Sequence, residues 1–281
     1  MIVNRFCVAA LALGAILQIP VGVVAQESEK NVQRMASVKA KANSGDPRAQ
    51  SELGAAYLRG EGMPANNAEA IKWFRKAAEQ GDAVAQDWLG QIFAMGYGVP
   101  VDNLEAEKWL RRAAEQGDAL GQFGLAAMYS EGKGVSKDEA EAFKWLSKAA
   151  DQGFAPAQFG LGQAYENGRG IAPSLVEAFK WYKKAADQDY PDALNSLAFI
   201  MATSKVDKLR DPDTAIAIAQ KAVNISKQNP FFIDTLARCY FEAGQYGKAV
   251  DAERDAVALS PENESYKNEL QKYLDASNQK P

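Results

Sequence analysis

Ser130 and Lys133 are the residues whose types and spacing come nearest to enzyme chemistry in this sequence. They stand in Ser130-Glu-Gly-Lys133, and Ser-x-x-Lys is the spacing of the nucleophilic serine and its lysine in serine β-lactamases. The chain has neither the Lys-Thr-Gly nor the Ser-Asp-Asn sequence that accompanies such a serine. Gly132 also occupies a turn position that recurs along the chain. We therefore interpret the match as coincidental.

The amino-acid composition removes most other kinds of enzyme and metal site. Histidine is absent, and the two cysteines are Cys7 and Cys239. This excludes histidine-based triads, zinc sites built from histidine or cysteine, and Cys-x-x-Cys redox pairs. Aspartate and glutamate remain available for acid–base or calcium chemistry, but they form no cluster of the required kind. We expect no catalytic residue, no bound cofactor and no metal.

Paired glycines and a column of lysines could bind phosphate, but both have a simpler structural explanation. The glycines lack the third glycine of a phosphate loop and lie between predicted helices rather than after a strand. Each lysine stands three residues after a glutamate, which favours a salt-bridged solvent face over an anion site. These lysines are Lys72, Lys108, Lys144 and Lys180. The 32 basic and 36 acidic residues are interspersed along the chain, so we expect no nucleic-acid partner.

The elements that position these residues recur every 36 residues. This period aligns the tryptophans Trp73, Trp109, Trp145 and Trp181, the leucines Leu53, Leu89, Leu125 and Leu161, and the glycine pairs at 60/62, 96/98, 132/134 and 168/170. A period of this length indicates stacked supersecondary units. An Ala-Ala pair follows each tryptophan at helical spacing, so we predict that the tryptophans are buried and hold neighbouring repeats together.

Each 36-residue row predicts two helices, because capping residues mark where both begin. Asp46, Asp82 and Asp118 each follow a glycine, which suits one helix ending at an αL glycine and another beginning at an aspartate N-cap. The second helix of each row has the sequence of a capping box. Its N-caps Asn66, Asp102, Asp138 and Ser174 stand three residues before Glu69, Glu105, Glu141 and Glu177. The Gly-x-Gly pairs allow a sharp reversal, so the two helices should pack antiparallel as a hairpin.

Two sequence patterns recur in these rows: Ala-Gln-x-x-Leu-Gly-x-x-Tyr-x-x-Gly-x-Gly-Val, and Glu-Ala-x-Lys-Trp-x-x-Lys-Ala-Ala-x-Gln-Gly. They resemble the Sel-one-like repeat (SLR) family, a branch of the tetratricopeptide repeat (TPR) superfamily. The resemblance covers about residues 49–188, and the sequence from 191 onward is similar to TPR repeats. It implies an all-α fold, a right-handed α-solenoid of antiparallel helix pairs that forms an SLR/TPR superhelix.

The N-terminal residues have the features of a secretory signal. Arg5 supplies a positive charge, residues 6–24 are apolar apart from Gln18, and Val23-Val24-Ala25 fits signal cleavage. We expect cleavage after Ala25 and a periplasmic or secreted protein with no membrane span. An uncleaved anchor is the alternative, because about 19 apolar residues could nearly span a bilayer. After cleavage Cys239 would be left without a partner for an intramolecular disulfide.

These features together divide the chain into five segments. We predict a signal peptide at 1–25, an N-terminal capping helix at 26–44, four SLR repeats at 45–190, TPR-like repeats at 191–261, and a C-terminal capping helix and tail at 262–281. The N-terminal capping helix carries a weak apolar stripe, consisting of Val32, Met35, Val38 and Ala42.

In TPR-like superhelices, first-helix residues beside the Leu-Gly and Tyr columns line the concave face, where partners usually lie. Carried over by resemblance, this partner-binding groove comprises Asp87, Gln91, Phe123, Phe159, Gln163, Asn195, Phe199, Phe231, Arg238 and Phe241. Its phenylalanines favour binding of a peptide, a partner helix or a glycan, although Phe123 and Phe159 could instead pack between repeats. Trp88 stands outside the tryptophan column and is a further candidate contact.

The SLR resemblance implies a scaffold or adaptor, and the signal predicts export, so we expect an adaptor of the bacterial cell envelope. We expect a protein or peptide partner. One alternative is a module that binds cell-wall glycan through stacked aromatic side chains. The other is a hydrolase such as a β-lactamase, for which the sequence offers only the spacing of Ser130 and Lys133.

Overall fold

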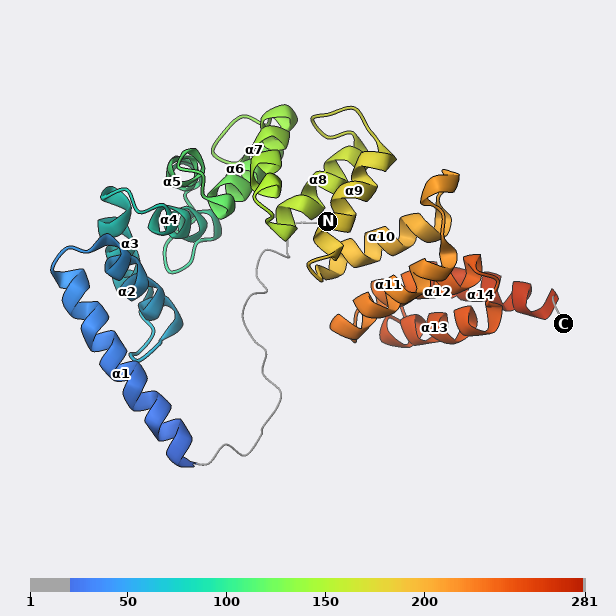
Figure 1. Ribbon diagram of the computed structural model, residues 1–281, viewed down its shortest axis with the longest axis horizontal. Coiled ribbons are helices and arrows are strands. Elements are labelled where there is room, and N and C mark those ends of the chain that lie inside the picture. Colours follow the sequence, from blue (N-terminus) through green and yellow to red (C-terminus); the bar gives the residue numbers. More distant parts are fainter. Residues whose placement is uncertain (1–20, 280–281) are drawn as a thin grey trace. The chain divides into compact units, whose positions relative to one another are not determined.

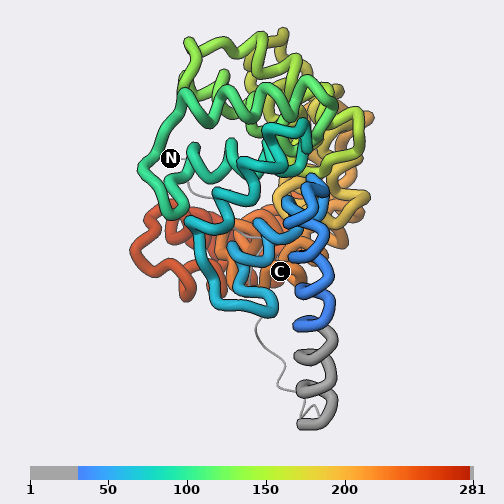
Figure 2. Tube along the Cα trace, turned by 90° about the vertical axis from the view of Figure 1, so that its left-hand side faces the viewer, coloured from blue at the N-terminus to red at the C-terminus, as the bar shows by residue number. Residues whose placement is uncertain are grey.

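The computed structural model describes residues 21–279, with side chains described for residues 31–278. Residues 1–20 of the predicted signal peptide, Cys7 among them, lie outside the described residues. Fourteen α-helices and one short 3-10 helix make up the described part, which contains no β-strand (Figure 1). Figure 2 shows successive helical coils joined by short connections. The prediction of an all-α chain is confirmed.

The chain divides into two compact units, and the boundary between Ala85 and Gln86 falls inside a helix. The first unit contains α1 (Val21–Asn43), α2 (Pro47–Arg59), α3 (Asn67–Glu79) and the start of α4 (Ala83–Met95). Here α1 packs on α2, and α2 packs on α3. The three buried members of the predicted capping stripe, Met35, Val38 and Ala42, make the α1 contact, whereas Val32 is exposed.

The second unit continues from α4 as an uninterrupted series of helices. They are α5 (Asn103–Glu115), α6 (Ala119–Glu131), α7 (Glu139–Asp151), α8 (Ala155–Asn167), α9 (Leu175–Ala186), α10 (Pro191–Thr203), the 3-10 helix η1 (Asp207–Leu209), α11 (Pro212–Ile225), α12 (Pro230–Glu242), α13 (Tyr246–Leu259) and α14 (Glu264–Gln279). Each α-helix from α5 to α13 packs against the α-helix that follows it. This is the α-solenoid arrangement that the repeats predict.

The second helices of the repeats begin at the predicted N-caps, but the capping box is only half formed. The side chain of Asn66 accepts the N–H of Glu69 at 3.1 Å, as the pattern requires. Its own N–H donates to the carbonyl of Tyr57 at 2.8 Å, and the same bond joins each N-cap to the aromatic residue nine positions earlier. Glu69 instead pairs with Lys72 at 3.2 Å. The N-cap N–H therefore ties the two helices of a hairpin together.

The turn glycines do more than reverse the chain. All eight glycines of the Gly-x-Gly pairs have φ between 68° and 73°, a region that favours glycine. A Cβ added to Gly134 would collide with the carbonyl oxygen of Asn103, and one added to Gly170 would collide with that of Glu139. Because Asn103 and Glu139 begin second helices, these glycines also let each turn seat against the preceding repeat.

Glutamines connect successive repeats through a series of amide hydrogen bonds, which we call the glutamine ladder. In each bond an exposed glutamine donates to a buried one. Nε2 of Gln152 donates to Oε1 of Gln122, and Nε2 of Gln188 donates to Oε1 of Gln158, each at 2.8 Å. Gln158 itself donates to the carbonyl of Ala150 at 3.2 Å. Gln158 of α8 thus links the carboxyl-terminal ends of α7 and α9. The recurring sequence patterns contain these glutamines, but repeat spacing alone does not predict the hydrogen bonds between them.

The four tryptophans of the repeats do not pack equally. Trp73 and Trp109 are buried, whereas Trp145 and Trp181 are half-buried. Nζ of Lys184 lies 3.6 Å from the ring centroid of Trp181, and a basic side chain covers each of the other three rings. The prediction of four buried tryptophans is therefore wrong for Trp145 and Trp181, whose rings remain partly at the surface beneath a lysine.

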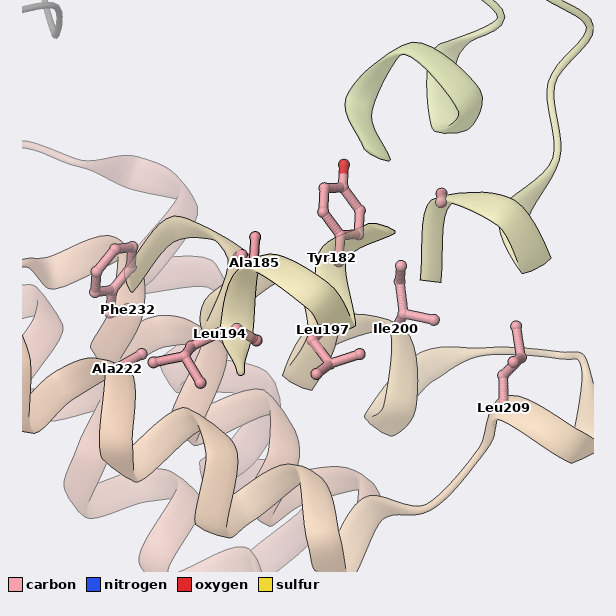
Figure 3. Close-up of a cluster of buried hydrophobic side chains, with 11 residues drawn as sticks. Tyr182, Ala185, Leu194, Leu197, Ile200, Leu209, Ala222 and Phe232 are labelled. Carbon is pink, nitrogen blue, oxygen red and sulfur yellow. The ribbon is translucent and has the colours of Figure 1, made fainter. Parts of the chain in front are cut away.

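A large hydrophobic cluster joins the fourth repeat to the C-terminal helices (Figure 3). It gathers Tyr182 and Ala185 from α9, Leu194, Leu197 and Ile200 from α10, Ala222 from α11 and Phe232 from α12. Tyr182 is fully buried, and its hydroxyl donates to the carboxylate of Glu166 at 2.6 Å. Burial and this hydrogen bond raise the pKa of Tyr182 above its usual range.

Candidate functional site

The predicted groove residues lie mainly in two columns on the first helices of the second unit. The fifth residues of α4, α6, α8, α10 and α12 form the inner column, which is Asp87, Phe123, Phe159, Asn195 and Asp234. The ninth residues form the outer column, which is Gln91, Ala127, Gln163, Phe199 and Arg238. A spacing of four residues is about one helical turn, so both columns belong to one side of each helix.

The inner column packs into the protein rather than facing a partner. Asp87 and Asn195 are buried. The ring of Phe123 packs edge to face against that of Phe154, with ring centroids 5.5 Å apart, and the ring centroids of Phe159 and Tyr190 are 5.4 Å apart. These contacts match the alternative in which Phe123 and Phe159 pack between repeats.

Asp87 is a buried carboxyl that sits where the first repeat has a serine. In that repeat Ser51 donates to the Asp82 carboxylate at 2.9 Å. Asp118 is the counterpart of Asp82, so Asp87 brings a second carboxyl to this position. Burial and the charge of Asp118 raise the pKa of Asp87 to about 7, although Gln91 donates to its carboxylate at 2.6 Å. Asp87 and Gln91 are thus predicted groove residues that the structure brings together.

The outer column reaches the surface, and Phe199 is its most exposed large side chain. Phe199 is 46% exposed, whereas Gln91 and Gln163 are half-buried. At the C-terminal end of the column, Arg238 forms an ion pair with Glu269 of α14 at 2.8 Å. A partner that reaches this side therefore meets amides and one open aromatic ring.

The remaining predicted residues divide between exposed and packed positions. Phe231, near the start of α12, is 55% exposed, and its ring centroid lies 6.2 Å from that of Phe232. Phe241 is half-buried against Tyr273 of α14, with ring centroids 4.8 Å apart. Trp88 is also half-buried. The prediction of a single groove therefore stays untested, and its exposed aromatic part consists of Phe199 and Phe231.

Ser130 and Lys133 are not arranged as a catalytic pair. Ser130 is the second-last residue of α6, and its hydroxyl donates to the carboxylate of Glu139 at 3.2 Å. Lys133 lies beyond the helix end and pairs with Glu131 at 2.7 Å. Gly132 between them has φ of 71° and forms the αL cap of α6. Each side chain thus has an acidic partner of its own, as expected for an ordinary repeat turn.

An open groove of about 390 Å³ lies between α11, α12 and α13 and was not predicted. Val223, Leu236, Tyr240 and Ala252 give it an apolar floor, and charged side chains that include Lys227 surround them. None of the predicted groove residues lines it. Its apolar residues come from three helices, and no single stretch of sequence indicates such a groove.

The described part of the chain shows neither a metal cluster nor a membrane span. Within residues 21–279, no three acidic or cysteine side chains are placed to hold a metal ion together. Over the same residues, every helix is too short or too polar to cross a membrane.

Comparisons with known proteins agree with the repeat architecture. The family model of the Sel1 repeat matches residues 47–82, 83–118, 119–154 and 155–190. The crystal structure of a Sel1 repeat protein from Oxalobacter formigenes is 37% identical, with a TM-score of 0.65 over 69% of this chain and 80% of that one. Curated proteins give no match to this chain.

A second solved structure is similar over more of the chain. It is c5321, a protective antigen present in uropathogenic Escherichia coli strains that displays an SLR fold. It is 30% identical to this chain, with a TM-score of 0.50. The match covers 85% of this chain but 59% of c5321.

Proposed function

This chain belongs to the Sel1 repeat family, and from this premise we propose that it is an exported adaptor of the bacterial cell envelope. Repeat proteins of this kind generally mediate protein–protein interaction and bind protein or peptide partners. They are generally scaffolds rather than enzymes. The adaptor would hold a peptide or a partner helix against the outer column of its first helices.

The exposure of Phe199 is the observation that supports this proposal most strongly. It is a large aromatic side chain, 46% exposed, in a column whose neighbouring members include the amide side chain of Gln163. Aromatic side chains provide much apolar contact area at low entropic cost, and amides beside them can bond a peptide backbone. The packed side chains of the inner column, on the same helices, would hold this surface rigid.

Alanine substitution with a matched control tests the proposed surface. Ile225, at the end of α11, is also 46% exposed but lies outside the predicted groove. We expect a partner captured by the chain from residue 26 onward to bind at least about tenfold more weakly to Phe199→Ala, a loss of about 1.4 kcal/mol. Ile225→Ala should bind normally. Equal binding by both folded variants would exclude the outer column.

Export rests on the N-terminal residues and has its own test. Arg5, the apolar residues 6–24 and Ala25 support a cleaved signal. We expect N-terminal sequencing of the protein recovered from cells to begin at Gln26, in the periplasmic or secreted fraction. Recovery of the uncleaved chain in the membrane fraction would support the anchor instead, and recovery in the cytosol would exclude export.

Cell-wall glycan is the second candidate ligand, because sugars stack on open aromatic rings. Phe199 and Phe231 are the exposed rings of the predicted groove. Sedimentation with isolated cell wall that is abolished by Phe199→Ala and by Phe231→Ala, but not by Ile225→Ala, would favour the glycan over a protein partner.

A further inference from the structure

The C-terminal helix α14 covers part of the helix pair α12–α13 with aromatic and charged contacts. Tyr273 of α14 is fully buried, and its ring lies 4.8 Å from that of Phe241 in α12. Glu269 forms an ion pair with Arg238 at 2.8 Å and another with Lys272 at 3.2 Å. Figure 1 shows α12, α13 and α14 together at the C-terminal end of the chain. Docked α14 therefore contacts and partly covers Arg238 and Phe241, two residues of the predicted groove.

Glu253 is buried where these three helices meet. Its exposed fraction is 0%, and neither carboxylate oxygen accepts a hydrogen bond from a protein donor. The titratable and charged groups that face it are Asp234 and Arg238 from α12, and Tyr266, Glu269 and Tyr273 from α14. A carboxylate in such a place lacks the hydrogen bonds that normally compensate for its burial.

The surroundings of Glu253 favour its protonated form. Burial first, and then the charges of Asp234 and Glu269, raise the pKa of Glu253 to about 8 against the opposing charge of Arg238. Burial also raises the pKa of Asp234. A proton on Glu253 removes one negative charge and provides a donor for the Asp234 carboxylate.

We propose that α14 is a proton-dependent latch, docked on α12 and α13 while Glu253 holds a proton and loosened when that proton is lost. Loosening would admit water to the Glu253 carboxylate and uncover Arg238 and Phe241. The latch rests on the packing of these three helices and does not require the outer column to bind anything.

The sign of the pH effect follows from the raised pKa of Glu253. Its contribution to docking is fully present below the usual glutamate pKa and is lost as the pH rises through about 8. Glu269 acts in the opposite direction. Burial opposes its ionisation, but Lys272 and Arg238 outweigh this and lower its pKa, so its contribution is lost in acid. Docking of α14 should therefore weaken from mildly acidic to alkaline pH.

Hydrogen-exchange mass spectrometry on the full chain measures this docking directly. From about pH 6 to about pH 9, protection factors in α14 should fall at least about tenfold, the equivalent of one unit of pKa difference. Those in α8, which carries the ladder amide Gln158, should stay constant. Unchanged protection in α14 over this range would overturn the proposal.

Two variants and a control assign the effect to Glu253. Glu253→Gln should keep α14 protected from about pH 6 to about pH 9, because the amide resembles the protonated acid in shape and charge. Glu264→Gln removes an exposed carboxylate of α14 that pairs with Lys267, and it should behave as the unmodified chain. The same loss of protection in Glu253→Gln would contradict the latch. If Glu253→Gln does not fold, Asp234→Asn provides the test, because the charge of Asp234 helps to raise the pKa of Glu253. A fall in α14 protection as large as that of the unmodified chain would then contradict the latch.

Discussion

Two regions of the second unit bury polar side chains in different ways. In the SLR repeats, Gln158 donates to the carbonyl of Ala150 and accepts from Gln188, so both ends of its amide are satisfied. Near the C-terminus, Glu253 is as deeply buried, but its oxygens accept no hydrogen bond from a protein donor. The amide has no titratable proton, whereas the carboxyl does. We therefore expect pH to affect the packing of α14 much more than it affects the glutamine ladder.

The comparison also separates the two kinds of surface. The repeats form a series of similar junctions, which suits a rigid binding face of fixed spacing. The C-terminal junction contains Arg238 and Phe241 under a helix that depends on one proton. We therefore expect Gln163 and Phe199 of the outer column to be open to a partner at any pH, and Arg238 and Phe241 only when α14 loosens.

The largest expected effect comes from removing a buried aromatic side chain at the junction of the two regions. Tyr182→Ala deletes a fully buried ring and its hydrogen bond to Glu166. We expect it to lower the free energy of unfolding by about 3–5 kcal/mol. Chemical denaturation of the full chain measures this loss. Trp145→Ala, at a half-buried ring, should cost less, and an equal cost would contradict the uneven packing of the tryptophans.

The next largest effect is an increase in the free energy of unfolding, caused by Glu253→Gln. Glu253→Gln removes a group with a pKa of about 8, so it should stabilise the chain at about pH 8 by at least about 1.4 kcal/mol, the equivalent of one pKa unit. Near pH 4 the gain should vanish, because the native acid is then protonated in the folded and unfolded states alike. Denaturation midpoints at the two pH values compare these cases, and a gain at neither pH would show that Glu253 is not strained when ionised.

Breaking the glutamine ladder should cost a similar amount, but independently of pH. Gln158→Leu removes the hydrogen bonds that join Gln158 to the Ala150 carbonyl and to the Gln188 amide, although Gly153 still bonds both of these groups. Leucine already stands at the equivalent position, Leu194, where the ladder ends. We expect a loss of about 1–3 kcal/mol. Unfolding measured over the same pH range should give parallel curves for variant and unmodified chain. A strongly pH-dependent loss would contradict the contrast between the two regions.

Asp87 is a carboxyl within the repeats and offers a smaller test of the same contrast. Its pKa of about 7 lies above the usual aspartate value, so its contribution to stability is lost as the pH rises through 7. Asp87→Ser restores the residue type of Ser51, which donates to Asp82. Above pH 7 we expect the variant to be more stable by up to about 1 kcal/mol. Thermal unfolding across this range checks it, and a serine variant with an unchanged pH profile would contradict the role of Asp87.

The smallest effect belongs to the surface ion pairs. Lys180 and Glu177 pair at 2.7 Å on an exposed helix face. Lys180→Ala should change the free energy of unfolding by less than about 0.5 kcal/mol, because water and salt screen such pairs. A loss above 1 kcal/mol would contradict the interpretation of this lysine column as a solvent face.

Much of the fold can be predicted because its signals are local. The N-cap side chain of Asn66 and the left-handed conformation of Gly168 act within a few residues, so the sequence places helix starts and turns correctly. The capping box fails because a tertiary bond to Tyr57 replaces the local one. Likewise, half-burial of Trp181 depends on how neighbouring helices cross, and repeat spacing alone does not determine that.

The candidate site is harder to predict, because exposure depends on packing between repeats. The sequence assigns Asn195 and Phe199 to one face, yet the first is buried and the second is exposed. Glu253 is more predictable, because it falls at helical spacing within the apolar stripe of Val250 and Ala256. This pattern indicates a buried carboxyl.

Site-specific photo-crosslinking tests the proposed adaptor function most directly. A photoreactive phenylalanine analogue would replace Phe199 in one variant and Ile225, equally exposed, in another. Both variants would be expressed with the native N-terminus and irradiated in living cells. We predict a discrete crosslinked envelope protein or peptide from position 199 and none from position 225. Equal crosslinking from both positions, or none from position 199 in a folded and exported chain, would contradict a partner on the outer column.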